Sequence, residues 1–370
     1  MAFEVELRRL KEFRAAMKNK GMDAFVLFVL EGFNSEGCRY LSGFSGSSAA
    51  LLIDECRAVL VTDGRYRTQA PAQSPFEVVI QSELPLPLYL AKAVRETEHW
   101  HKVGFEAEKV SHALYETVLR PSGAEWVDAS ALIASLRRSK DETEAEAIRK
   151  AAVIARQAYD KTLERVRPGM TEAEFESLLL YEIKNLGGER GWPHNDFIIA
   201  SGLRGAMCHG RATQKPFELG EVVTVDYGAT LGGYMSDITR NFALGQPDPR
   251  ALEIDEILVR AHQAAAEALR PGLSGKEADA IARKVIADAG YGENFIHGLG
   301  HGLGLEIHEA PRLSLISKDV LQVGDVVTVE PGIYIEGWGG LRIEDDYLIT
   351  EDGARCLSLS DDQHLRILKV

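Results

Sequence analysis

The sequence predicts an α+β protein of two domains, the second of which is an internal duplication. Residues 1–136 alternate between helical and strand patterns, as in a compact α/β domain. In residues 137–370, the segments 220–226 (GEVVTVD) and 324–330 (GDVVTVE) each run an apolar strand into a carboxylate. A repeat of this kind indicates a pseudo-twofold domain with an acid at the same point of each copy.

The first domain is expected to begin with a helix. Leu7, Leu10, Phe13 and Met17 recur at helical spacing, and this stripe ends near Gly21. The helix is followed by a buried strand, then by further strands and helices. The strands are predicted at 24–30, 49–53, 58–62 and 76–80, and the helices at 88–96 and 111–119.

The second domain begins with the charged stretch 137–144 and a long helix. Its two copies share a helix start, because Thr171 with Glu174 and Ser274 with Glu277 have the spacing of a capping box. Each copy is expected to form two helices and a two-stranded ribbon. We expect the ribbons to pair into one antiparallel sheet, with helices on one face and the acids on the other.

Four carboxylates occupy matching places in the two copies. Asp226 and Glu330 end the repeated strands, and Asp237 and Glu344 follow the glycine pairs of 232–237 and 339–344. A pseudo-twofold fold would bring all four together. Carboxylates so close could not all stay ionised without a large positive charge among them, which indicates bound metal ions.

Strand periodicity divides the residues after the first glycine pair between two faces. A polar face would carry Asp237, Thr239 and Asn241, and a mostly apolar face would carry Ile238, Arg240 and Phe242. By the same rule Arg342 and Glu344 share a face, so that Arg342 can orient a carboxylate or reach a substrate oxygen.

Three histidines lie within twelve residues, at His297, His301 and His308, among many glycines. Oxygen ligands suit manganese, cobalt, zinc or magnesium, and a histidine shifts the choice toward a transition metal. A lone buried histidine is more often a core residue than a ligand, and an apolar strand that ends in Asp is common. Four acids related by a repeat, together with this cluster, favour a metal site over those structural interpretations.

These motifs resemble the pita-bread metallopeptidases, which include aminopeptidase P, prolidase and methionine aminopeptidase, over essentially the whole chain. The resemblance implies a pita-bread catalytic domain and a five-ligand site for two divalent metal ions, with manganese expected and cobalt or zinc as alternatives. His301 is the expected histidine ligand because it stands in a Gly-His-Gly context, and His297 is the weaker candidate. The implied ligands are Asp226, Asp237, His301, Glu330 and Glu344.

The resemblance also implies roles around the metals. Glu330 would shuttle a proton as well as bind metal, while His209 and His308 would donate hydrogen bonds to the developing oxyanion or to the substrate carbonyl. His297, Tyr334 and Arg342 resemble the residues of this family that contact the substrate or support the ligands. In relatives a proline is expected near the histidine that matches His209, whereas this sequence has Met207 and Cys208 before it.

The first domain narrows the range of expected substrates. Segments 40–47 and 62–66 look like the creatinase-type N-terminal domain of the proline-directed members, which implies cleavage before a proline in second position. An aminopeptidase P removes one residue from longer peptides, whereas a prolidase accepts dipeptides. Segment 62–66 leans toward the aminopeptidase and segment 297–312 toward the prolidase, and we place the aminopeptidase first. A binding protein that has lost its metals, or a metal-free creatinase, is disfavoured because all five ligand positions are filled.

Composition excludes several other classes of function. The net charge of −14 opposes binding to nucleic acid or to anionic membranes. The start of the chain lacks the apolar core of a signal peptide, no apolar run reaches the length of a membrane span, and the four cysteines are scattered. These features predict a cytoplasmic protein with free thiols, and the resemblance implies a homodimer.

Overall fold

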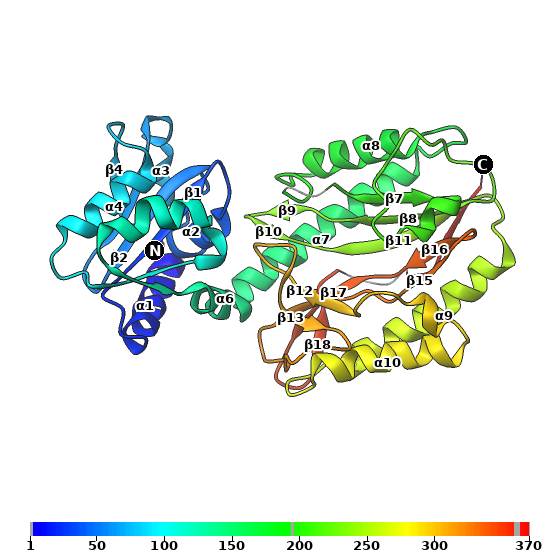
Figure 1. Ribbon diagram of the computed structural model, residues 1–370. Coiled ribbons are helices and arrows are strands. Elements are labelled where there is room, and N and C mark those ends of the chain that lie inside the picture. Colours follow the sequence, from blue (N-terminus) through cyan, green and yellow to red (C-terminus); the bar gives the residue numbers. More distant parts are fainter. Residues whose placement is uncertain (1–2, 194–195, 359–362, 370) are drawn as a thin grey trace. The chain divides into compact units, whose positions relative to one another are not determined.

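The computed structural model describes residues 3–193, 196–358 and 363–369. The chain folds as two compact units, Met1–Arg137 and Arg138–Val370. Figure 1 shows each unit with its own sheets and helices. In the described residues, no helix is both long enough and apolar enough to cross a bilayer. All four cysteines are free thiols, as expected.

The first unit is a six-stranded mixed sheet with the strand order β4-β3-β2-β1-β5-β6. Its centre is an antiparallel meander of β1, β2 and β3, and β4, β5 and β6 are added in parallel. The four predicted strands are confirmed as the buried strands β1, β2 and β3 and the partly exposed edge strand β4, whereas β5 and β6 were not predicted. The strands are β1 (Ala24–Leu30), β2 (Ser48–Asp54), β3 (Ala58–Thr62), β4 (Glu77–Ile80), β5 (Lys102–Phe105) and β6 (Glu125–Asp128).

Helices pack against this sheet with apolar stripes. Leu10, Phe13 and Met17 of the first helix are buried, but Leu7 is half exposed, so the stripe is one residue shorter than predicted. The helix predicted at 111–119 is irregular, with an α-helical turn followed by a wider turn at Tyr115–Leu119. The helices are α1 (Glu4–Asn19), α2 (Ser35–Ser42), α3 (Gln69–Gln73), α4 (Leu86–Glu96), α5 (His112–Leu114) and α6 (Ser130–Arg138).

The second unit consists of two similar halves. In the first half, α7 (Glu142–Leu163) and α8 (Glu172–Asn185) cover a sheet with the order β19-β11-β8-β7, and a buried apolar cluster fills the space between them. In the second half, α9 (Pro249–Ala268) and α10 (Gly275–Asp288) cover the sheet β13-β12-β14-β17-β18 over a second cluster. Figure 1 shows α8 on one outer side of this unit, α9 and α10 on the other, and the strands between them.

The strands of the second unit carry the repeated motifs, and both predicted capping boxes are present at the starts of α8 and α10. The strands of the first sheet are β7 (Ile198–Ser201), β8 (Val222–Tyr227), β11 (Ile238–Leu244) and β19 (Arg366–Leu368). Those of the second are β12 (Gly300–Gly302), β13 (Glu309–Leu313), β14 (Val326–Val329), β17 (Asp345–Ile349) and β18 (Ala354–Cys356). Two short ribbons pair β9 (Thr230–Leu231) with β10 (Tyr234–Met235) and β15 (Gly332–Ile335) with β16 (Gly339–Arg342).

The prediction of one continuous antiparallel sheet is wrong. The two repeated strands lie in separate sheets, and between the halves the described residues form one isolated bridge, Thr239 with Glu344. Each sheet needs its own pair of helices to bury its outer face, so two layered halves meet along their acid-bearing ends. The acids consequently lie between the sheets.

Candidate metal centre

The first half delivers its two acids from an antiparallel pair of strands. Val223 and Val225 of β8 point into the apolar cluster, so the alternating residue Thr224 faces the other way, and Asp226 continues that polar face. Asp226 lies opposite Thr239 of β11. Asp237 immediately precedes β11, and its backbone N–H donates to Asp346 Oδ2 at 3.0 Å.

The second half delivers Glu330 directly after β14 and Glu344 between β16 and β17. Glu344 meets the first half through two contacts with Thr239. Its backbone N–H donates to the Thr239 carbonyl at 3.3 Å, and the Thr239 hydroxyl donates to Glu344 Oε2 at 2.7 Å. The bridge between the halves therefore also fixes one oxygen of an acid.

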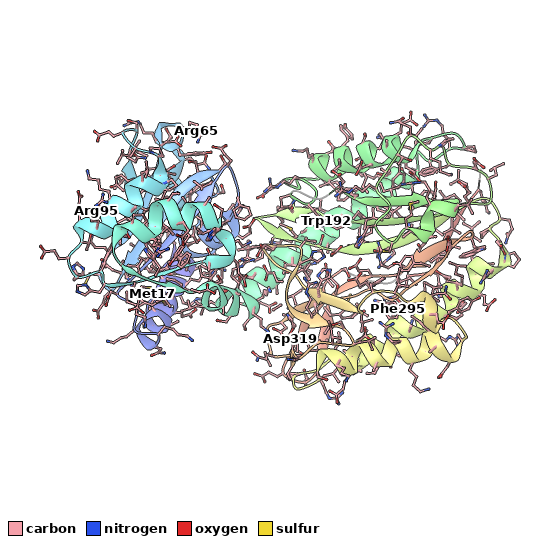
Figure 2. All side chains as sticks on the ribbon, in the orientation of Figure 1. Met17, Arg65, Arg95, Trp192, Phe295 and Asp319 are labelled. Atoms are coloured by element: carbon pink, nitrogen blue, oxygen red, sulfur yellow. The ribbon has the colours of Figure 1, made fainter. Side chains whose placement is uncertain are left out.

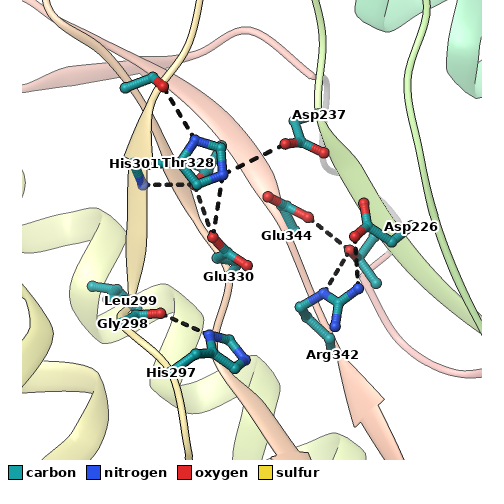
Figure 3. Close-up of polar contacts among 12 residues, drawn as sticks. Asp226, Asp237, His297, Gly298, Leu299, His301, Thr328, Glu330, Arg342 and Glu344 are labelled. Atoms are coloured by element: carbon teal, nitrogen blue, oxygen red, sulfur yellow. Dashed lines mark hydrogen bonds and ion pairs between the residues drawn. The ribbon is translucent and has the colours of Figure 1, made fainter. Parts of the chain in front are cut away.

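His301 is held among these acids by its own backbone and by a glycine neighbour. A Cβ on Gly300 would lie 2.1 Å from the Thr328 carbonyl oxygen, so only glycine permits this close approach of strands. The His301 N–H donates to Thr328 Oγ1 at 3.1 Å. Figure 3 shows the imidazole pointing from β12 toward the acids, with Nε2 3.4 Å from Glu330 and 3.7 Å from Asp237.

The protonation of His301 suits a metal ligand. Burial lowers its pKa to about 3, so the ring is neutral. Nδ1 lies 3.1 Å from the Gly302 carbonyl oxygen, which can only accept, so we assign the proton to Nδ1. The Nε2 lone pair then faces two carboxylates, an arrangement that a cation would stabilise.

The environment of these carboxylates disfavours their charged form. Burial, together with neighbouring carboxylates, raises the pKa of Asp237 and of Glu344 well above the ordinary range. Burial raises the pKa of Glu330 to about 8. The Oδ1 atoms of Asp226 and Asp237 are buried, and neither has a hydrogen-bond partner among the described residues.

Divalent cations fit this arrangement. Asp237, His301 and Glu344 each offer a ligand atom, and the three atoms lie within 4.8 Å of one another. Buried oxygens without donors, neutral imidazole nitrogen and mutually repelling carboxylates are all stabilised by a bound cation.

Arg342 links the acids to the surrounding residues. Its Nη2 donates to Asp226 Oδ2 at 2.7 Å (Figure 3). Its Nε donates to the Thr239 hydroxyl at 3.0 Å, and its Nη1 donates to the Tyr334 hydroxyl at 2.6 Å. Arg342 and Glu344 thus both face the acids, as the strand pattern predicted. One oxygen of Asp226 is oriented by this guanidinium and the other is left for a ligand.

His297 lies outside the group of acids. Its Nδ1 is 2.8 Å from the Gly298 carbonyl oxygen and its Nε2 is 3.0 Å from the Tyr334 hydroxyl. Because that hydroxyl already accepts from Arg342, it can donate its own proton to Nε2. Burial lowers the pKa of His297 to about 4, so the ring is neutral and both its nitrogens are used.

A cavity of about 500 Å³ opens in front of the acids. The exposed side chains of His209 and His308 line it, and the His308 ring packs edge to face on His301 with centroids 4.3 Å apart. The sequence reasoning did not assign Arg211 and Arg312, which also line the cavity. Arg312 stands four residues after His308 in the same segment, and this spacing was the available signal.

Behind the acids lies a buried charged pair that sequence reasoning did not predict. Arg240 was expected on a mostly apolar face with Ile238 and Phe242, and there its Nη2 donates to Asp345 Oδ1 at 2.7 Å and its Nη1 to the Glu344 carbonyl at 2.7 Å. Both charged side chains are almost fully buried. The consecutive acids Asp345 and Asp346, directly after Glu344, were the signal for buried partners.

Two family models match most of this chain. The family described as "Metallopeptidase family M24" matches residues 146–351, and the "Creatinase/Prolidase N-terminal domain" matches residues 9–139. The "Uncharacterized peptidase YqhT" of Bacillus subtilis is 38% identical over 95% of this chain and 98% of its own. The "Xaa-Pro dipeptidase" of Pyrococcus furiosus is 40% identical over 83% of this chain and 88% of its own.

Two solved structures are similar over nearly the whole chain. The "Xaa-Pro dipeptidase from Bacillus anthracis" superposes with a TM-score of 0.90 at 39% identity, covering 98% of this chain and all of that one. The X-Pro aminopeptidase from Thermotoga maritima gives a TM-score of 0.88 at 35% identity, covering 96% of this chain and all of that one. A protein named as a dipeptidase and a protein named as an aminopeptidase therefore both share this fold.

Proposed function

Because the chain belongs to metallopeptidase family M24, we propose that it is a metal-dependent exopeptidase that cleaves the bond between an N-terminal residue and a following proline. The observation that carries the proposal is the buried group of Asp237, His301 and Glu344, whose ligand atoms converge within 4.8 Å. The names of the similar dipeptidases and aminopeptidase support the choice of a proline substrate.

Five residues would hold two divalent ions. They are Asp226, Asp237, His301, Glu330 and Glu344, of which the first two have a buried oxygen without a donor among the described residues. When bound, such ions lower the pKa of a coordinated water and polarise a carbonyl oxygen.

Glu330 is the residue that we propose for proton transfer. A carboxylate that can be protonated near neutral pH can take a proton from the attacking water and return it to the proline nitrogen as the peptide bond breaks. Burial raises the pKa of Glu330 to about 8 without bound metal, so this position favours the protonated form of the carboxyl group. Bound cations would lower that pKa toward the working pH.

His209 and His308 would bind the substrate carbonyl. Both line the cavity, from opposite halves of the second unit. Burial and the charge of Arg312 lower the pKa of His308, so its ring is a neutral N–H donor. A neutral donor aimed at the oxygen where charge develops lowers the barrier by about 3 to 4 kcal/mol. His297, Tyr334 and Arg342 would keep the ligands and the cavity wall in place.

A specific observation favours dipeptides among the possible substrates. The guanidinium of Arg312 lines the cavity and makes no ion pair with any residue that the structure describes. A dipeptide would carry its free carboxylate close to the cleaved bond, where an arginine could bind it. Comparing hydrolysis of Ala-Pro with that of Ala-Pro-Ala-Ala separates a dipeptidase from an aminopeptidase.

Three finer proposals depend on the family resemblance. They are manganese as the native metal, assembly as a homodimer and a cytoplasmic location. Metal analysis of protein purified without added metal, light scattering after gel filtration and cell fractionation test them in turn.

The decisive experiment strips the protein of metal and adds Mn²⁺ back. We expect no turnover of either peptide after chelation and full recovery with Mn²⁺. Glu330→Gln should abolish turnover while the protein still binds Mn²⁺, and Glu336→Gln, at an exposed position on the neighbouring turn, should behave as wild type. Activity that survives complete chelation contradicts the proposal.

A further inference from the structure

The first residue of α8 holds a catalytic loop from inside the protein. Glu172 is fully buried, and each of its two oxygens accepts several hydrogen bonds. Oε1 accepts from the N–H and the hydroxyl of Ser201, at 2.9 and 2.8 Å. Oε2 accepts from the N–H and the hydroxyl of Thr213, at 3.0 and 2.8 Å, and from the Arg204 guanidinium.

The segment between these partners enters the cavity. Cys208, His209 and Arg211 line it, and Arg204 also donates to the Arg211 carbonyl at 2.7 Å. His209 itself makes no hydrogen bond to any described residue. Its position therefore depends on the backbone of the loop. Glu172 holds both ends of that loop and Arg204 near its start, and Arg342 Nη1 donates to the Cys208 carbonyl at 3.2 Å beside His209.

The second half holds its histidine-bearing loop in a similar way. Asp279 of α10 is fully buried, and its Oδ1 accepts the Leu299 N–H at 3.0 Å. Arg283 donates to both oxygens of Asp279, and to the carbonyls of Phe295 and His297 at 2.7 Å each. Figure 2 labels Phe295 beside α10. The segment held by these bonds, residues 295–299, ends two residues before His301.

The two carboxylates that hold these loops, Glu172 and Asp279, do not occupy the same place in the repeat. Glu172 follows the capping residue Thr171, but Ser274 is followed by Gly275, where a Cβ would lie 2.0 Å from the Arg312 carbonyl oxygen. The second half therefore cannot place an acid there and uses one four residues later. Each half therefore holds its loop with a buried carboxylate paired with an arginine, although the carboxylate stands at a different place in the repeat.

We propose that Glu172 with Arg204 and Asp279 with Arg283 are positioning pairs with divided tasks. The first pair sets His209 against the substrate carbonyl, and the second sets His301 for metal binding. This inference depends on the proposed function for its catalytic part. Residues that orient a ligand or catalytic group through hydrogen bonds typically change affinity or activity by about 10- to 100-fold when mutated.

The first test is Glu172→Gln. This change keeps the shape of the side chain but places an amide NH₂ where the carboxylate accepts hydrogen bonds from the loop. We expect kcat/KM for Ala-Pro to fall about 10- to 100-fold while Mn²⁺ affinity stays within about twofold of wild type. In the His209→Ala background the same change should cost less than about threefold, because its target is gone. Glu218→Gln, an exposed carboxylate near the loop, is the matched control.

The second test is Asp279→Asn, read by calorimetric titration of the metal-stripped protein with Mn²⁺. We expect the affinity to fall at least about tenfold, without any need for peptide turnover. Wild-type kcat/KM in Glu172→Gln, an undiminished loss in the His209→Ala background, or unchanged Mn²⁺ affinity in Asp279→Asn overturns the proposal.

A direct readout of the loop separates this proposal from the proposed function. The rate of Cys208 alkylation, followed by peptide mapping, should rise in Glu172→Gln. If His209→Ala keeps full activity, the catalytic role of His209 is wrong, and the alkylation rate alone decides the positioning role, which an unchanged rate overturns. Should Glu172→Gln fail to fold, Ser201→Ala and Thr213→Val each remove one hydroxyl donor and should show smaller effects of the same pattern.

Discussion

The metal-free protein should lose stability as the pH rises, because its acids favour the proton. The folded-state pKa of Glu330 is about 8, against an ordinary value of 4.5. A carboxyl group with a raised folded pKa stabilises the fold fully below its unfolded pKa, and this contribution is lost as the pH rises through the folded value. At about 1.4 kcal/mol for each tenfold change, the loss between 4.5 and 8 is about 5 kcal/mol.

That loss is large against the usual stability of about 5 to 15 kcal/mol. Asp237 and Glu344 act in the same direction, since burial and mutual repulsion also raise their pKa values. About 2 to 3 kcal/mol of the Glu330 contribution should disappear between about pH 6 and pH 8. Bound Mn²⁺ replaces the protons and should remove most of this dependence.

Urea unfolding of chelator-treated protein over this pH range measures the effect. Fluorescence of Trp192 and Trp338 reports on the second unit, with Trp100 and Trp126 of the first unit replaced by Phe. The urea midpoint should fall with rising pH without metal and stay nearly constant with Mn²⁺. Glu330→Gln, neutral at every pH, should flatten part of the metal-free curve. A metal-free midpoint that does not change with pH, or a Glu330→Gln curve identical to wild type, refutes the reasoning.

Four further variants test the metal ligands, the substrate cavity and the buried ion pair. His301→Ala should weaken Mn²⁺ binding at least about 100-fold by calorimetry, whereas His297→Ala should keep it within about threefold; equal losses contradict the assignment of the ligand. Arg312→Met should raise KM for Ala-Pro about tenfold or more and leave Ala-Pro-Ala-Ala nearly unchanged, and a uniform effect argues against a carboxylate site. Arg240→Met should lower the free energy of unfolding by about 3 to 5 kcal/mol, because it strands Asp345 without its cation; a urea midpoint like that of wild type rules this out.

Local signals in the sequence predicted the local structure well. The capping boxes of Thr171 with Glu174 and Ser274 with Glu277 are present because both partners lie within one turn of a helix. Four strands of the first unit were found because their runs of apolar and β-branched residues are typical of a sheet, but β5 and β6 were missed. His301 lies next to Asp237 and Glu330, and its role as the metal ligand stays a prediction.

Contacts between residues far apart in the sequence could not be predicted. Arg240 and Asp345 lie more than a hundred residues apart, and strand periodicity gives only the face on which Arg240 lies. The carboxylate of Glu172 reads as an ordinary first-turn acid, yet its partners lie in a loop roughly thirty to forty residues later. The repeat also suggested one sheet, because a sequence repeat does not say whether its strands pair or stack.

The metal centre is a property of the contact between the halves, since each half orients an acid of the other. Thr239 of the first half fixes an oxygen of Glu344, and Arg342 of the second half fixes an oxygen of Asp226. The backbone N–H of Asp237 likewise donates across the contact to Asp346. Neither half alone holds a preorganised set of ligands, so a change that shifts one sheet against the other should affect metal binding before it affects either apolar core.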